Sequence, residues 1–192
     1  MPEFGKKANA QVSIMTRFFK ISLLLTGMAV VSGLAVVPDL FGNSGENRKL
    51  KFYHTHTGKE LEVTYYQQGE YDPQALALIR VYLADWRDGK QQDLDPELMD
   101  VLWQIQLATG NANTWEVISA YRSPQTNELL RSRSSGVAKK SQHLVGNAID
   151  VRLRGLDLEV LRDTARSLEL GGVGYYPGSD FVHVDTGRVR YW

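Results

Sequence analysis

The chain has 192 residues with 22 Lys and Arg against 22 Asp and Glu, so its formal net charge is zero. A balanced charge gives no overall field to hold an extended polyanion, which argues against a dedicated nucleic-acid binder. No cysteine occurs in the sequence. Disulfides, thiolate metal ligands and a cysteine nucleophile are therefore excluded.

The first 37 residues are typical of an export signal. Residues 1–20 carry four basic side chains against one acidic side chain, and an apolar run of 17 residues follows at 21–37. A basic stretch before an apolar run with small residues near its end is the pattern of a secretory signal, and cleavage after Ala35 would fit it. The run is also at the lower limit for crossing a bilayer, so an uncleaved inner-membrane anchor is the alternative. Either version predicts that the rest of the chain is exported by the general secretory route, to the periplasm.

After a linker over residues 38–49, residues 50–192 predict a single domain of mixed helices and strands. Strand-like runs at 50–54 and 60–66 bracket a His-Thr-Gly turn and predict a hairpin. Asp72-Pro73 and Asp95-Pro96 each place a capping carboxylate before a proline that suits the first helical turn. The first helix is expected to bury a stripe formed by Leu76, Ile79, Leu83 and Trp86. The second is expected to bury Leu98, Leu102 and Ile105 and to stop at Gly110.

The second half of the domain predicts four strands and two more helices. The strands are expected at 115–122, 148–153, 172–176 and 181–185, and the helices over 158–168 and from 124 toward 136. Because helices precede a cluster of neighbouring strands, the order favours an α+β fold with a small antiparallel sheet and helices packed to one side.

Three side chains in unusual surroundings point to a metal site. His143 lies in a Gly-containing loop, and Asp150 follows in an apolar strand between Ile149 and Val151. A carboxylate there is costly to bury unless something neutralises it, and a cation would do so. In the strand 181–185, alternation puts His183 on a face that it could share with Asp150. Two imidazoles and one carboxylate suit Zn²⁺ and leave a fourth position for water, although a polar core is the alternative from spacing alone.

Three motifs together resemble a known family. S-x-H-x-x-G-x-A-x-D runs from Ser141 to Asp150, S-x-Y-R precedes it at 119–122, and H-V-D follows it at 183–185. This pattern resembles the zinc murein peptidases, the fold group of the D-Ala-D-Ala carboxypeptidases and the Hedgehog signalling domain. The closer similarity is to the YcbK-like branch, the murein endopeptidase K family, and it covers about 145 residues from the hairpin to Trp192.

The resemblance implies a ligand set and one further catalytic residue. His143, Asp150 and His183 match the zinc ligands of the family, with one Zn²⁺ per chain, and Arg122 matches the motif arginine that polarises the scissile carbonyl. A fixed guanidinium can strengthen its hydrogen bonds as the carbonyl oxygen gains charge. A structural ion pair is the alternative for Arg122.

The general base is expected to be Asp180. Relatives place Glu or Asp three residues before the last zinc histidine, and Asp180 occupies that position. A carboxylate there could take a proton from the attacking water and return it to the leaving amine. Asp185 is the competitor for this role, and it could instead orient the imidazole of His183 because the two share a strand face.

Other residues give weaker indications. Tyr175, Tyr176 and Ser141 are candidates for substrate binding, with simple packing as the alternative for the tyrosines. His54 and His56 are expected to be exposed turn residues. A basic stretch could attract the carboxylates of peptidoglycan stems or be a solvated helix end; it comprises Arg131, Arg133, Lys139 and Lys140.

The resemblance implies a zinc-dependent murein endopeptidase, with peptidoglycan stem peptides as its partners. A monomer is the default expectation for the chain. The implied bond is the cross-link between two meso-diaminopimelate residues of adjacent stems. A carboxypeptidase that trims free stems and a non-catalytic zinc module like the Hedgehog domain are the alternatives.

Overall fold

The computed structural model describes residues 46–134 and 136–192. The predicted signal or anchor over residues 1–37, and the linker as far as residue 45, lie outside the described residues. Within the described part of the chain, no helix combines the length and the apolar character needed to cross a membrane.

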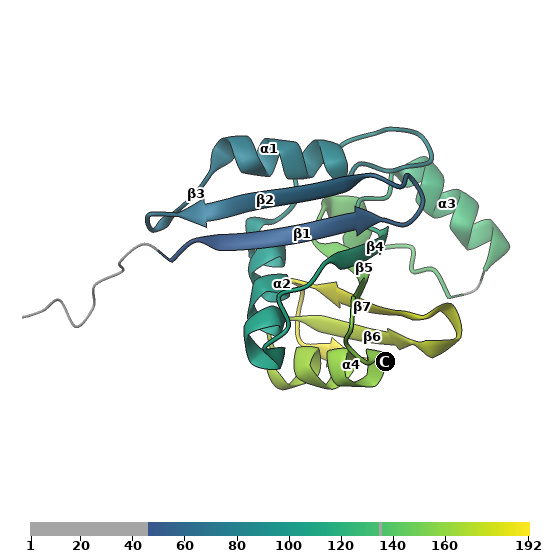
Figure 1. Ribbon diagram of the computed structural model, residues 1–192. Helices are drawn as coiled ribbons and strands as arrows, with labels where there is room; N and C mark the ends of the chain where they lie inside the picture. Colours follow the sequence, from purple (N-terminus) through teal and green to yellow (C-terminus); the bar gives the residue numbers. More distant parts are fainter. Residues whose placement is uncertain (1–45, 135) are drawn as a thin grey trace, which may run out of the picture. The chain divides into compact units, whose positions relative to one another are not determined.

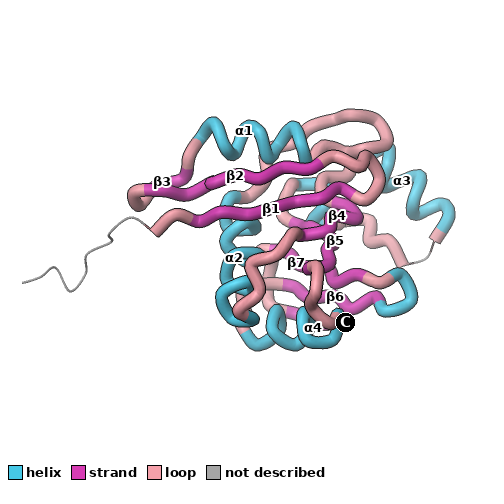
Figure 2. Tube along the Cα trace, viewed as in Figure 1, coloured by secondary structure: helices cyan, strands magenta, loops and turns pink. Residues whose placement is uncertain are grey.

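The described chain begins with three strands and two helices, and strands and helices are interspersed after them (Figure 2). In order they are β1 (Arg48–His54), β2 (Glu60–Gln67), β3 (Glu70–Tyr71), α1 (Pro73–Tyr82), α2 (Pro96–Thr109), β4 (Trp115–Ser119), α3 (Pro124–Arg133), the 3-10 helix η1 (Gln142–Val145), β5 (Ala148–Leu153), α4 (Leu158–Ser167), β6 (Gly172–Tyr176), the 3-10 turn η2 (Pro177–Ser179), β7 (Phe181–Asp185) and β8 (Arg190–Tyr191).

The strands of the described residues form one mixed sheet in the order β3-β2-β1-β4-β5-β7-β6-β8. The predicted α+β class is confirmed. The sheet is mixed and not purely antiparallel as predicted, because β1 pairs in parallel with β4 and β8 pairs in parallel with β6. The predicted hairpin of β1 and β2 is part of this same sheet, since β1 joins it through β4. A parallel pair needs a long crossover, and α1 and α2 provide the one between β1 and β4. In Figure 1, α1 lies along the hairpin and α4 lies at the opposite end, beside β6 and β7.

The helices begin where their capping residues predict. The side chain of Asp72 accepts hydrogen bonds from the backbone N–H groups of Gln74 and Ala75, and Asp95 accepts one from Glu97. Gly110 ends α2 in the left-handed conformation, as expected. Two predicted elements are too long: α3 ends at Arg133, and β4 ends at Ser119.

One apolar core lies between the sheet and α1, α2 and α4. The predicted stripe of α2 is buried, and Ile79 and Leu83 are buried at α1. The expected place of Trp86 in that stripe is wrong, because α1 ends at Tyr82 and Trp86 lies in the loop that follows, 39% exposed.

Alternation along β5 and β7 positions the polar face of the sheet. The two strands are antiparallel, with Asp150 opposite His183. Val182 and Val184 belong to the apolar core, so His183 and Asp185 face the other side of the strand. The polar residues therefore meet on the face of the sheet opposite the core.

Candidate metal centre and active-site cleft

The three predicted metal ligands converge. Nε2 of His143 lies 3.1 Å from Nδ1 of His183 and 3.2 Å from Oδ1 of Asp150. Nδ1 of His183 lies 2.8 Å from the same oxygen of Asp150. All three side chains are buried, and among the described residues they form the only group of three or more His, Asp or Glu able to hold a metal ion.

The motif that carries His143 folds locally for identifiable reasons. Ser141 caps η1, because its Oγ accepts a hydrogen bond of 3.3 Å from the backbone N–H of His143. Gly146 ends η1 with φ of 78°, and a Cβ added there would lie 2.3 Å from the backbone oxygen of Asp93. No other residue fits this position, so the Ser and the Gly of the motif hold the loop that aims His143 at the cluster.

Hydrogen bonds fix which nitrogen of each imidazole faces the cluster. Nδ1 of His143 lies 2.6 Å from the carbonyl oxygen of Ala120, which can only accept, so Nδ1 carries the proton. Nε2 of His183 donates to Asp185 across 2.9 Å. The nitrogens that remain, Nε2 of His143 and Nδ1 of His183, therefore point their lone pairs at a carboxylate oxygen of Asp150. Three acceptor atoms that meet in a buried space need a cation between them.

The pKa values agree with this reading. Burial raises the pKa of Asp150, but its contacts with His143 and His183 outweigh burial and hold the pKa well below its usual range. Burial lowers the pKa of His143. Burial also acts to lower the pKa of His183, yet hydrogen bonds to Asp150 and Asp185 leave that pKa raised. The cluster thus favours one positive charge next to the carboxylate of Asp150. A metal ion would supply this charge, and without a metal a proton on His183 does so.

The donor set fits Zn²⁺. Tetrahedral Zn²⁺ with bonds of about 2.0–2.1 Å separates its ligand atoms by about 3.3 Å, close to the separations within the cluster. Two imidazole nitrogens and one carboxylate oxygen are also the ligand types of catalytic zinc sites. The described residues supply three ligands, which leaves one coordination position for a water molecule or a substrate oxygen.

Arg122 belongs to the same cluster. Its Nη2 donates to Oδ2 of Asp150, the carboxylate oxygen that does not face the histidines, and its Nε donates to Oγ of Ser119 across 2.9 Å. Its backbone N–H donates to the carbonyl oxygen of His143. The guanidinium is thus held beside the metal position on the edge of the cleft.

A cleft of about 440 Å³ opens in front of the cluster. Residues of the segment 136–142, which leads into His143, line the cleft. Three aromatic side chains, Tyr176, Phe181 and Trp192, also line the cleft and form its aromatic wall. The rings of Tyr176 and Phe181 stack with centroids 4.6 Å apart, and Nε1 of Trp192 donates to the hydroxyl of Tyr176 across 2.7 Å. The cleft can therefore hold an extended peptide between a polar loop and an aromatic wall.

The structure places the two candidate bases differently. Asp180 is exposed at the turn between β6 and β7, with φ of 53°, and its Oδ2 lies 2.5 Å from Nη1 of Arg152. It does not line the cleft in front of the cluster. Asp185 is buried behind His183, where it also accepts hydrogen bonds from Arg190.

The structure also places the candidate substrate-binding residues in different surroundings. Ser141 and Tyr176 line the cleft. Tyr175 instead faces α4, where Arg162 lies over its ring and Glu159 accepts from its hydroxyl.

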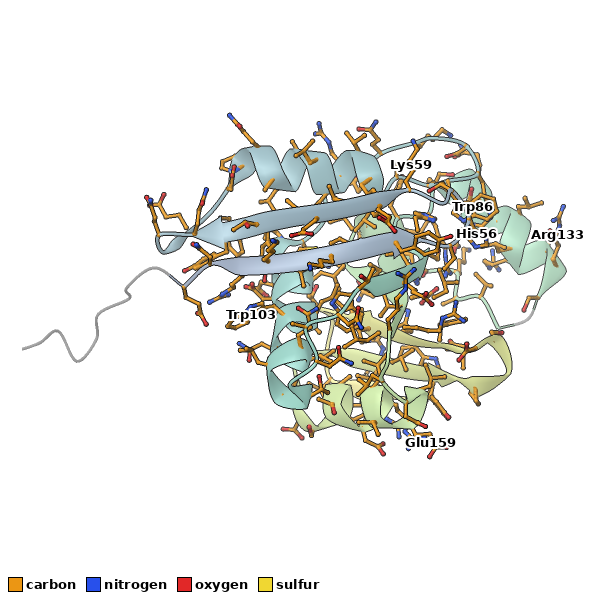
Figure 3. All side chains as sticks on the ribbon, viewed as in Figure 1. His56, Lys59, Trp86, Trp103, Arg133 and Glu159 are labelled. Atoms are coloured by element: carbon orange, nitrogen blue, oxygen red, sulfur yellow. The ribbon has the colours of Figure 1, made fainter. Side chains whose placement is uncertain are left out.

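The expectation that His54 is exposed is wrong. His54 is 1% exposed, because it is the last residue of β1 and packs beside Tyr82 of α1. His56 is exposed as expected, and its ring stacks on Trp86 with centroids 4.1 Å apart (Figure 3). Of the predicted basic stretch, only Lys140 lines the cleft, and Arg133 lies at the far end of α3 (Figure 3).

Three residues of the site were not predicted: Phe181, Arg190 and Trp192. Each lines the cleft. The ring of Trp192 lies 5.2 Å from that of His183, and the guanidinium of Arg190 lies over Trp192. The Arg-Tyr-Trp sequence at 190–192 is the signal that could have pointed to Arg190 and Trp192, and β8 brings it alongside β6.

Comparisons with known proteins agree on one family. The family described as peptidoglycan L,D-endopeptidase MepK matches residues 42–192. The chain is 39% identical over 171 residues to the peptidoglycan L,D-endopeptidase MepK of Escherichia coli (strain K12), covering 88% of this chain and 94% of that protein. It is 38% identical over 174 residues to the probable peptidoglycan L,D-endopeptidase MepK of Haemophilus influenzae, covering 88% of this chain and 92% of that protein. No solved structure matches the chain significantly.

Proposed function

This chain belongs to the peptidoglycan L,D-endopeptidase MepK family, a family of cell-wall peptidases, and we propose that it uses one Zn²⁺ to hydrolyse peptide cross-links of peptidoglycan. The preferred bond in this proposal joins two meso-diaminopimelate residues of adjacent stems. The observation that carries the zinc assignment is the convergence of three lone pairs, from His143, Asp150 and His183, in one buried space. We further propose that the chain acts as a monomer in the periplasm, exported or anchored through residues 1–37.

The residues around the metal position have separate roles in the proposed peptide hydrolysis. Zinc, when bound, lowers the pKa of a coordinated water toward 7 and polarises the scissile carbonyl. Arg122 lines the cleft next to Asp150, where its guanidinium can hydrogen-bond the carbonyl oxygen as that oxygen gains negative charge. The loop with His143 and the wall with Trp192 position the two sides of the substrate peptide.

Asp180 is the proposed general base. Asp185 is ill suited to accept a proton, because its carboxylate already accepts hydrogen bonds from His183, Arg190 and two backbone N–H groups. Asp180 is an exposed carboxylate on the turn that leads into His183, and to take a proton from water it must turn away from Arg152. Its return of that proton to the leaving amine would complete the reaction.

Digestion of purified muropeptide dimers by the full chain tests this function. Dimers joined through two diaminopimelate residues should fall to monomers, and a zinc chelator should stop the reaction until zinc is restored. His143→Ala should abolish both zinc binding and cleavage. His56→Ala, at an exposed histidine outside the cluster, should leave both unchanged.

Other outcomes assign the chain differently. Loss of the terminal residue from monomers, with dimers intact, would identify a carboxypeptidase. Zinc binding with no change in any muropeptide would identify a non-catalytic zinc module.

A further inference from the structure

The charged residues that line the cleft are unequal in number. Three cations line it, Arg122, Lys140 and Arg190, and Asp150 is the only carboxylate among the lining residues. Asp150 is paired with Arg122, and a metal ion held by Asp150 would neutralise it further. The cleft therefore presents a net positive charge to whatever peptide enters it.

Two of these cations already pair with carboxylates of the protein. Arg122 pairs with Asp150, and both terminal nitrogens of Arg190 donate to Asp185. Lys140 differs from them, because no carboxylate within residues 46–134 and 136–192 lies within salt-bridge distance of its ammonium group. Lys140 thus remains available to a ligand.

The backbone holds Lys140 next to the loop that carries His143. Lys140 directly precedes Ser141, which caps the 3-10 helix of His143. Two residues earlier, the carbonyl oxygen of Ala138 accepts a hydrogen bond of 3.2 Å from Nδ2 of Asn127, a buried residue of α3. The segment is thus tied down on both sides of Lys140.

The cleft also has an aromatic wall. Tyr176, Phe181 and Trp192 line it, and the ring of Trp192 lies beside the zinc-ligand candidate His183. An aliphatic chain packs well on such a wall, while a carboxylate does not. A peptide residue that carries both groups would therefore lie with its aliphatic part on the wall and its carboxylate toward Lys140.

We propose that Lys140 determines substrate specificity by binding a free carboxylate of the stem-peptide residue next to the scissile bond. This inference rests on the proposed function and names the chemical feature that the site selects, a carboxylate on an aliphatic amino-acid residue. Lys139, its neighbour in the sequence, does not line the cleft, so the two lysines form a matched pair for the test.

The test compares two dimers that differ in one group, the free carboxylate on the diaminopimelate residue next to the scissile bond, or its amide. Lys140→Gln should raise KM for the free-carboxylate dimer by about tenfold, which is the loss of one charge-assisted hydrogen bond, and should change kcat by less than about twofold. Wild-type protein should show the same increase in KM on the amidated dimer, and Lys140→Gln should add nothing to it. Lys140→Arg should restore most of the loss, and Lys139→Gln should behave as wild type with equal zinc content.

Two results would overturn the role of Lys140. One is an equal effect of Lys140→Gln on both dimers, and the other is no effect on either. If wild-type protein cleaves neither dimer, the proposed function fails, and calorimetric binding of the free and amidated stem peptides to wild-type and Lys140→Gln protein still decides the inference. A preference of the wild type for the free carboxylate that Lys140→Gln removes supports it, and equal binding rejects it.

Discussion

Nε2 of His183 donates a hydrogen bond of 2.9 Å to Oδ2 of Asp185, and this contact decides which nitrogen of His183 faces the metal position. Asp185 is held in turn by Arg190 and by the backbone N–H groups of Gly172 and Gly187. Burial raises the pKa of Asp185, but the hydrogen bonds from His183 and Arg190 outweigh burial and keep the pKa far below its usual range. Asp185 is therefore a permanent acceptor that orients His183.

Replacing Asp185 by Asn should weaken zinc binding. The amide can no longer accept from all of its present donors, because its Nδ2 is itself a donor that would meet Arg190 or an N–H group. Partners that orient metal ligands are worth about 10–100-fold in metal affinity, so a loss of that size is expected in competition with a chromophoric chelator. Asp180→Asn, on the turn between β6 and β7, is the control and should keep the wild-type zinc affinity. An unchanged affinity in Asp185→Asn would show that His183 needs no such partner.

Asp180→Asn should instead affect catalysis. A general base contributes about 10²–10⁴-fold, so kcat should fall by that factor on cross-linked dimers while KM and zinc content stay unchanged. Arg152→Gln removes the partner that holds Asp180 at 2.5 Å, and this variant should retain full activity. Retention of most of kcat in Asp180→Asn would exclude this residue as the base.

Gly174→Ala should disturb the aromatic wall. A Cβ at Gly174 would lie 2.6 Å from the ring of Trp192, so the ring must shift from its place beside His183. We expect a loss of about 1–3 kcal/mol in the free energy of unfolding, a change in tryptophan fluorescence and a higher KM for dimers. Gly178→Ala is the matched control, because a Cβ there has nothing within 4 Å. Both variants reduce the freedom of the unfolded chain alike, so equal stabilities would show that the wall tolerates the added methyl group.

The parts of the fold that short sequence signals determine were predictable. Asp95 and Gly110 mark the ends of α2 because capping depends on neighbouring residues alone. The convergence of His143, Asp150 and His183 was predictable because Asp150 is conspicuous inside an apolar strand and the motif that joins it to His143 is local. The parallel pairing of β1 with β4 was not, since it depends on how α1 and α2 return the chain across the sheet.

The contacts that the sequence did not predict are long-range. Asp180 meets Arg152, a residue 28 positions earlier, and β8 contributes Arg190 through a pairing of only two residues. Strands this short carry no detectable alternation. Burial of His54 likewise results from the packing of α1 against the end of β1, which no pattern within the turn itself reveals.

His54 should make the stability of the protein fall at acidic pH. Burial, with added repulsion from His56 and Lys59, lowers its pKa from 6.5 to about 4. Between these two values the unfolded chain binds more protons than the folded chain, so the free energy of unfolding rises with pH. The contribution is fully present above pH 6.5 and is lost as the pH falls toward 4, by about 3 kcal/mol over that interval.

His54→Asn isolates this contribution. Its amide oxygen can take the place of Nδ1, which accepts from the backbone N–H of His56, but the side chain no longer titrates. Urea unfolding between pH 4.5 and 7.5, with zinc chelated in both proteins, should give a shallower rise of stability with pH in the variant. His143 and His183 titrate in both proteins and cancel in the difference. Parallel pH profiles for the two proteins would mean that His54 accepts a proton in the folded state as readily as in the unfolded chain.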